Sequence, residues 1–184
     1  VVAAGLLLAW NLLRRQRLLP TRREWMTLLP AGLLLWVGGN GLVNWAEQRA
    51  DSGYAALLVG AMPIWVVLME ALIDRRRPTY HLIGALVIGF AGLGVLTWPV
   101  LRAATGAGPA QAAALVLAPL SWGAGSIYLT RRAVQLGPTA SSAWQQLAGA
   151  CGFLIVALCT REPWPQPSAQ AWAAWGYLVV AGSI

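Results

Sequence analysis

Polar side chains that could bind a small molecule recur at helical spacing in and just after one apolar stretch of the chain. Trp36, Asn40, Asn44 and Glu47 follow one another at intervals of four, four and three residues. On an α-helix they would form one stripe. Amide groups are costly against lipid, so in a membrane this stripe should turn towards other helices or a hydrated cavity. The alternative is structural, with hydrogen bonds between helices and an ion pair of Glu47 with an arginine nearby.

Further candidates for binding and gating lie in the later apolar stretches. Trp36, Trp65 and Trp122 could provide stacking walls for an aromatic or cationic substrate, although packing is the simpler role for each. Ser126, Tyr128 and Gln145 carry hydroxyl or amide groups that could also bind the substrate. Hydrogen bonding between helices is the default role of such groups. Two prolines, Pro63 and Pro119, lie inside apolar stretches and could kink gating helices. Static kinks are the alternative, because membrane helices tolerate proline.

Neither enzyme nor metal chemistry is indicated by the sequence. It contains no Ser, His and Asp set, no HExxH motif, no pair of intramembrane carboxylates and no phosphate-binding glycine loop. The two cysteines, Cys151 and Cys159, lie eight residues apart in one apolar segment, beyond disulfide reach on a helix. The single histidine, His81, has no cysteine or histidine partners at metal-ligand spacing. We therefore expect no enzyme, no metal and no cofactor.

The elements that carry these residues are predicted to be membrane-spanning helices. Seven apolar segments cover residues 1–13, 26–46, 52–72, 80–100, 110–129, 139–160 and 172–184. The five interior segments each have about 20 residues, which is the length a helix needs to cross about 30 Å of hydrocarbon. The two outer segments are shorter and look incomplete. The sequence thus predicts an all-α, polytopic membrane bundle.

The arginines predict the orientation of this bundle. All 13 basic residues are arginine, and ten of them lie in the first, third and fifth loops between the apolar segments. Basic residues in short loops are retained on the cytoplasmic side, so the Arg-rich loops are predicted to be cytoplasmic in a multi-pass plasma membrane protein. The chain is 58% hydrophobic and has a net charge of +7. Because its arginines lie mostly at helix ends, this charge is attributed to membrane topology, and no nucleic acid partner is expected.

An internal repeat appears when the chain is aligned with itself at an offset of 147 residues. The matched pairs include Gly5 with Gly152, Leu7 with Leu154, Arg14 with Arg161, Pro20 with Pro167, Thr21 with Ser168 and Trp25 with Trp172. The offset crosses five spans, an odd number, so the second copy would enter the membrane from the opposite side. Inverted repeats of this kind build many secondary transporters. With five helices per repeat, the parent protein would have ten helices with both termini in the cytoplasm.

A family resemblance agrees with this arrangement. From Tyr54 the chain reads YAALLVGAMPIWVVLMEALIDRRRPTYHLIGALVIGFAGLGVL, which resembles the end of the first EamA domain of the drug/metabolite transporter superfamily. The later stretches LAPLSWGAGSIYLTRRAVQLGPTASSAWQQLAGACGFLIVAL and AWGYLVVAGSI resemble the opening of the second domain. The family usually has Glu before the arginine of the turn, where this chain has Asp74. The resemblance implies a fragment with the end of the first repeat at 1–100, an external linker at 101–109 and the start of the second repeat at 110–184.

The resemblance also implies the activity of a permease for small metabolites, often amino acids or related compounds and commonly exported. Its partners would be the lipid bilayer and a small-molecule substrate, with transport by alternating access. Glu47 is the acid we nominate for a coupling proton, because it shares a face with Asn40 and Asn44. The alternatives are a membrane-embedded scaffold or interaction protein that does not transport and, less favoured, a membrane enzyme. Substrate, coupling ion and oligomeric state do not follow from the sequence.

Overall fold

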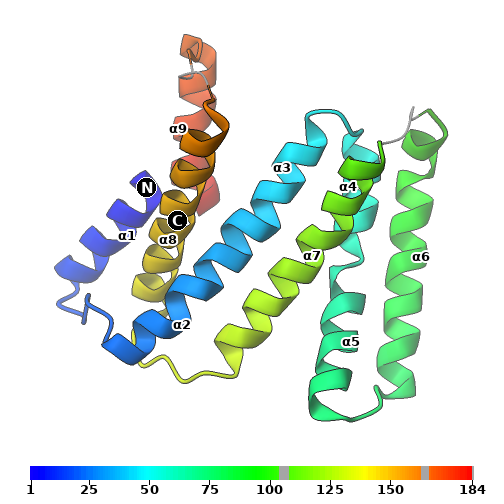
Figure 1. Cartoon of the computed structure of the whole chain (residues 1–184), viewed down its shortest axis with the longest axis horizontal. Coiled ribbons are helices and arrows are strands. Elements are labelled where there is room, and N and C mark those ends of the chain that lie inside the picture. Colours follow the sequence, from blue (N-terminus) through cyan, green and yellow to red (C-terminus); the bar gives the residue numbers. More distant parts are fainter. Residues whose placement is uncertain (104–107, 163–165, 184) are drawn as a thin grey trace. The chain divides into compact units, whose positions relative to one another are not determined.

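The computed structural model describes residues 1–103, 108–162 and 166–183, and this part of the chain is helical with no strand. In chain order the elements are α1 (Val2–Leu13), α2 (Arg22–Gly32), the π-helix η1 (Leu33–Gly41), α3 (Leu42–Glu47), α4 (Ser52–Gly60), α5 (Met62–Asp74), α6 (Tyr80–Ala103), α7 (Pro109–Thr130), α8 (Pro138–Thr160) and α9 (Ala169–Ser183) (Figure 1). The predicted all-α class is confirmed. The predicted linker at 101–109 falls partly on residues 104–107, which lie outside the described residues.

Within the part of the chain that the structure describes, five helical stretches are long and apolar enough to cross a membrane. They are Arg22–Glu47, Ser52–Asp74, Tyr80–Trp98, Pro109–Thr130 and Pro138–Thr160. Each contains one of the five interior segments predicted from the sequence, or nearly all of it. The first begins four residues earlier than the apolar run, because Thr21 and Glu24 form a capping box at its start. A capping box satisfies backbone donors at the helix end and so extends the helix into charged sequence.

The chain folds into two compact units. The first unit contains Val1–Leu33 and Arg132–Ile184, and the second contains Leu34–Arg131. These units are defined by contacts within the structure, whereas the repeat boundaries at 1–100 and 110–184 come from the family resemblance. The repeat boundaries therefore stay a prediction.

In the first unit α8 packs against α1 and α2. Ala4, Leu7 and Ala143 form a small buried cluster, and the Thr139 hydroxyl donates to the buried Asn11 side chain at 2.9 Å. These contacts join the end of α1 to the start of α8, so the two helices run in opposite directions (Figure 1). An antiparallel pair is what an inverted repeat requires, because α1 and α8 carry its two copies.

The helix ends and starts of the two copies have the same local geometry. Arg15 and Arg161 both have a left-handed backbone, with φ of 53° at each, and the following amide bonds to a carbonyl five residues back. Thr21 and Ser168 then cap the next helix, each accepting a backbone N–H three residues on. With the offset of 147, Arg161 matches Arg14, so the left-handed residue comes one position earlier in the second copy than in the first. In both copies a helix that ends at a left-handed residue is followed by a helix with a hydroxyl side chain at its N-cap.

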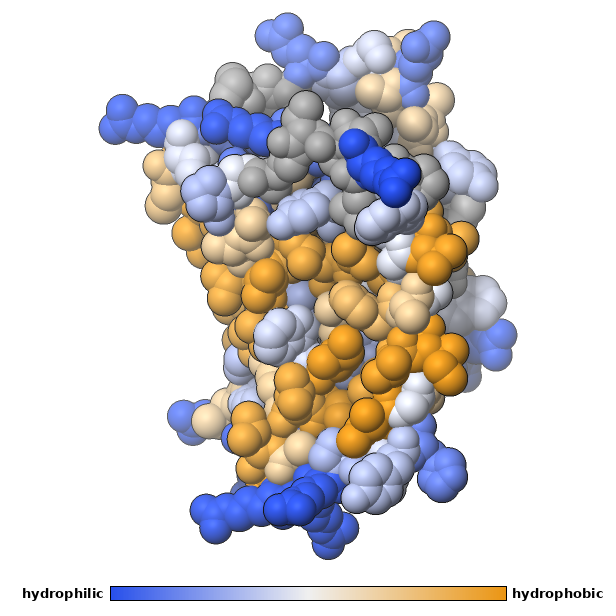
Figure 2. Space-filling view, turned by 90° about the vertical axis from the view of Figure 1, so that its right-hand side faces the viewer, coloured by the Kyte–Doolittle hydropathy of each residue, from blue (hydrophilic) through white to orange (hydrophobic). Residues whose placement is uncertain are grey.

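In the second unit α7 packs against α3, α4 and α5, and α6 packs against α4. A buried cluster lies where α3 ends and α4 and α7 begin, and it is formed by Ala46, Ala50, Ala55, Ala114 and Leu115. Where α5 crosses α7, Gly123 leaves room for its neighbours, since an added Cβ would lie 2.6 Å from the Met69 methyl group. On the face that carries α5 and α6, hydrophobic side chains form a band between hydrophilic ends, as expected of a surface against lipid (Figure 2).

Candidate functional site

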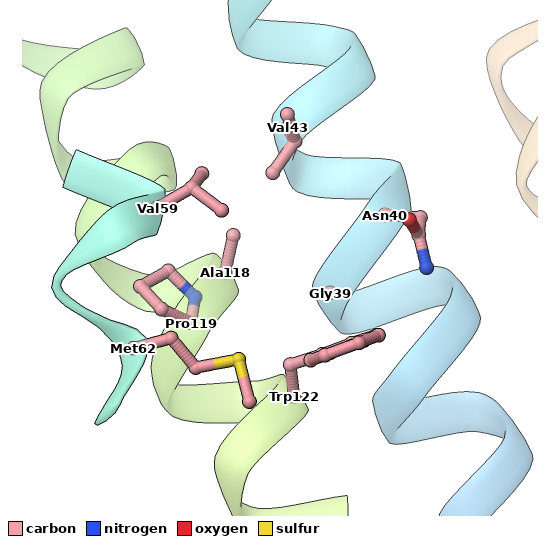
Figure 3. Close-up of a pocket in the computed structure, with 8 residues that line it drawn as sticks. All are labelled: Gly39, Asn40, Val43, Val59, Met62, Ala118, Pro119 and Trp122. Carbon is pink, nitrogen blue, oxygen red and sulfur yellow. The ribbon is translucent and has the colours of Figure 1, made fainter. Parts of the chain in front are cut away.

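A pocket of about 190 Å³ lies inside the second unit, between η1 with α3, the α4–α5 junction and α7. Its lining residues are Gly39, Asn40, Val43, Val59, Met62, Ala118, Pro119 and Trp122 (Figure 3). Most of these side chains are apolar, and the Trp122 indole forms one wall. An apolar cavity with few polar groups is the usual form of a small-molecule site.

The first wall of the pocket is built from π-helical backbone. Residues Leu33–Gly41 form π turns, in which each amide bonds one residue further back than in an α-helix. The Asn40 side chain follows the same spacing, donating to the carbonyl of Leu35 at 3.0 Å. Its amide lies on the side of the helix away from Met62, while Gly39 faces the Trp122 ring (Figure 3). Gly39 is buried, and a Cβ there would clash with the indole.

The second wall lies at a break in a helix. The sequence predicted one helix over 52–72, but α4 ends at Gly60 and α5 begins at Met62. Pro63 stands in the first turn of α5, where its missing N–H is tolerated. Pro63 has no N–H to donate, so the Val59 carbonyl lacks the partner that a continuous α-helix would give it, and at this helix end it lies instead near the backbone N–H of Ala61. Val59 and Met62 line the pocket from either side of the break.

The third wall is α7, which stays helical through the buried Pro119. Next to it, the Ser121 hydroxyl donates to the carbonyl of Leu34 at 2.9 Å and so ties α7 to η1. Pro119 and Trp122 lie three residues apart and both reach the pocket. The pocket thus forms where three spans each depart from a regular α-helix or contain a proline.

The structure brings three of the residues predicted for the site to this pocket, namely Asn40, Pro119 and Trp122. The others lie elsewhere: Trp36, Trp65, Ser126 and Tyr128 are half-buried, Pro63 is exposed next to the pocket residue Met62, and Asn44 and Glu47 are exposed. Gln145 is buried in the first unit, where its backbone packs on Gly32. Gly39 and Val43, four residues apart, face the pocket, and the Asn40 amide lies on the side of the helix away from Met62. Asn44 and Glu47, which follow Asn40 along the chain, are exposed and do not line the pocket.

Sequence reasoning missed the pocket residues Val43, Val59, Met62 and Ala118. They are ordinary apolar residues of membrane helices, and nothing in their type marks them. Gly39 was the available indication, since it stands in a run of glycines around Asn40.

A surface ion pair joins the ends of α5 and α7 in the same unit. Both guanidinium NH₂ groups of Arg131, just after α7, bond to the carboxylate of Asp74 at the end of α5, at 2.7 and 2.8 Å. Both side chains are about 40% exposed, which makes this a surface pair of small energetic weight. The hydrogen bond to Asp74 raises the pKa of the Arg131 guanidinium above its ordinary value, so it stays charged. Asp74, which stands where the family usually has Glu, therefore has Arg131 as its partner in the structure.

Comparison with known proteins gives a consistent result. The family model described as EamA-like transporter family matches residues 1–98. The chain is 30% identical over its whole length to a protein of Escherichia coli K12 named uncharacterized inner membrane transporter YedA, and to proteins of the same name from strains O6:H1 and O157:H7. It spans 59% of the length of these relatives. No solved structure gives a significant match.

Proposed function

The chain belongs to the EamA-like transporter family, and from this premise we propose that the protein is a secondary transporter of small metabolites, such as amino acids or related compounds. It is a multi-pass membrane protein, like the inner membrane transporter it resembles. In our proposal it exports its substrate across the plasma membrane by alternating access, with the Arg-rich loops in the cytoplasm.

The observation that supports this proposal best is the position of the pocket beside two irregular points of the backbone and a proline inside a third helix. Substrate sites of secondary transporters typically lie near the bilayer midplane, where helices are interrupted. Here the pocket adjoins the π turns of η1, the break at Ala61 and Pro119 in the continuous helix α7. A helix break and a proline inside a helix both remove backbone hydrogen bonds that resist bending, so Pro63 and Pro119 are proposed as hinge positions.

The size and lining of the pocket support a small substrate with an apolar or aromatic part. Its volume of about 190 Å³ is below the range of roughly 300–1,000 Å³ that is typical of ligand pockets. Trp122 offers a stacking surface. The Asn40 amide, bonded to the Leu35 carbonyl on the side of the helix away from Met62, would have to rotate towards the pocket to bind the substrate. Glu47, exposed at the end of α3, is the proposed site of a coupling proton.

Counterflow in liposomes tests this proposal with the natural full-length protein and pooled amino acids and small metabolites. We expect uptake by the unmodified protein and a loss of at least about tenfold, or 1.4 kcal/mol of transition-state stabilisation, in Trp122→Ala and Asn40→Val. Matched controls are Trp45→Ala and Asn44→Val, because both residues are exposed and neither lines the pocket. Equal losses in the pocket variants and their controls would move the site elsewhere. Absence of any uptake would favour the scaffold alternative.

A further inference from the structure

A second, larger apolar groove opens on the surface of the second unit between α5 and α6. It has a volume of about 480 Å³, and every residue that lines it is apolar. Its walls come from α5 between residues 64 and 68 and from α6 between residues 83 and 91, with Pro78 of the connecting turn at one end. Val87 is 63% exposed and Leu68 45% exposed. The groove therefore belongs to the apolar face of Figure 2.

Three arginines stand directly before Pro78, at the end of the groove. Arg75, Arg76 and Arg77 are all exposed, and the left-handed backbone of Arg75, with φ of 52°, ends α5 at this point. The acid that precedes them, Asp74, is held by Arg131. Arg75 and Arg77 form no ion pair within the part of the chain that the structure describes. The turn therefore presents concentrated positive charge where the span Ser52–Asp74 ends.

We propose that the groove and the arginine turn together bind one anionic phospholipid. Its phosphate lies against Arg75 and Arg77, and one acyl chain lies along the groove between α5 and α6. Apolar walls alone do not select a lipid, because acyl chains are as apolar as the leucines that they touch. Charge provides the selectivity, since a basic residue near an anionic membrane surface strengthens binding by roughly fivefold.

The dimensions of the groove agree with a lipid from the adjacent leaflet. From Ile83 to Ala91 the groove follows α6 for eight residues, or about 12 Å at 1.5 Å per residue. One leaflet contributes about half of the roughly 30 Å hydrocarbon thickness. A chain whose headgroup rests on the arginine turn would thus stay within its own leaflet. This inference concerns the lipid-facing surface and does not depend on the transport activity.

Photolabelling of the natural full-length protein in phosphatidylcholine nanodiscs tests the proposal. The probes are phosphatidylglycerol and phosphatidylcholine that carry a diazirine in one acyl chain, with labelled positions mapped by mass spectrometry. We expect phosphatidylglycerol to label the groove residues of α5 and α6 more than phosphatidylcholine does. The double variant Arg75→Gln/Arg77→Gln should lower this preference by up to about 25-fold, which is fivefold for each arginine.

Two further variants separate the groove from general surface charge. Arg14→Gln/Arg15→Gln removes the same charge from another helix end with the same left-handed backbone, and it should leave the labelling of the groove unchanged. Ala91→Phe fills the groove, keeps the arginines, and should abolish labelling there. Equal labelling by both lipids, or equal loss in the two arginine variants, would overturn the proposal. A Val87→Cys protein that crosslinks to another helix or a second copy would also overturn it, because protein would then cover the groove.

Discussion

The carboxylate of Glu24 offers a direct test of how the first unit is held together. Glu24 is 5% exposed and accepts hydrogen bonds from the backbone N–H of Thr21 at 2.7 Å, the Thr21 hydroxyl at 2.9 Å and the backbone N–H of Gln135 at 3.0 Å. The Arg17 guanidinium also bonds to it. One buried acid therefore joins the loop before α2 to the loop before α8.

The cost of removing this carboxylate can be worked out from its partners. In Glu24→Ala two backbone amides lose a charged acceptor, and each such bond is worth about 1.5–3 kcal/mol. Arg17 is 43% exposed, so its ion pair adds no more than about 1 kcal/mol. We expect Glu24→Ala to lower the free energy of unfolding by about 3–7 kcal/mol in total. Glu24→Gln should cost about 1–2 kcal/mol, because its amide oxygen still accepts some of these bonds.

Titration with SDS in mixed micelles measures this free energy of unfolding for the full-length protein. Glu162→Ala is the matched control, because Glu162 is an exposed acid just after α8 whose side chain has no hydrogen bond to the residues that the structure describes. A loss below about 1 kcal/mol for Glu24→Ala, comparable to an ordinary surface substitution, would refute the reasoning.

Three further predictions concern packing, orientation and the surface ion pair. Gly32→Ala should destabilise the protein by about 1–3 kcal/mol in the same titration, because the added Cβ would lie 2.6 Å from a carbonyl oxygen of α8, whereas Gly84→Ala, with open space around it, should not. In a cysteine-free background, Arg76→Cys should react with an impermeant maleimide only after cells are opened, and Asp51→Cys should react in intact cells; the reverse pattern would invert the proposed topology. Asp74→Asn should leave the SDS midpoint unchanged, since its ion pair is exposed, and a clear shift would show that the pair is a structural lock.

The sequence by itself determined the helical class and the approximate bounds of the spans. A run of about 20 apolar residues in a bilayer has to satisfy its backbone internally, so composition and length are enough to predict a helix. The caps at the helix ends were not predicted from the sequence, but one pair of the internal repeat has a structural counterpart there. Thr21 and Ser168 match in the internal repeat, and in the structure both cap a helix.

The pocket was decided by tertiary structure. Its walls come from two consecutive spans and from α7, which is distant from both in sequence, and its apolar residues, such as Val59 and Ala118, have the types found throughout membrane helices. The π turns of η1 could not be predicted, because a run of apolar residues is compatible with α-helical and π-helical backbone alike. Packing between helices sets which side of each helix faces its neighbours, so Asn40 and Trp122 line one cavity while Asn44 and Glu47 lie outside it.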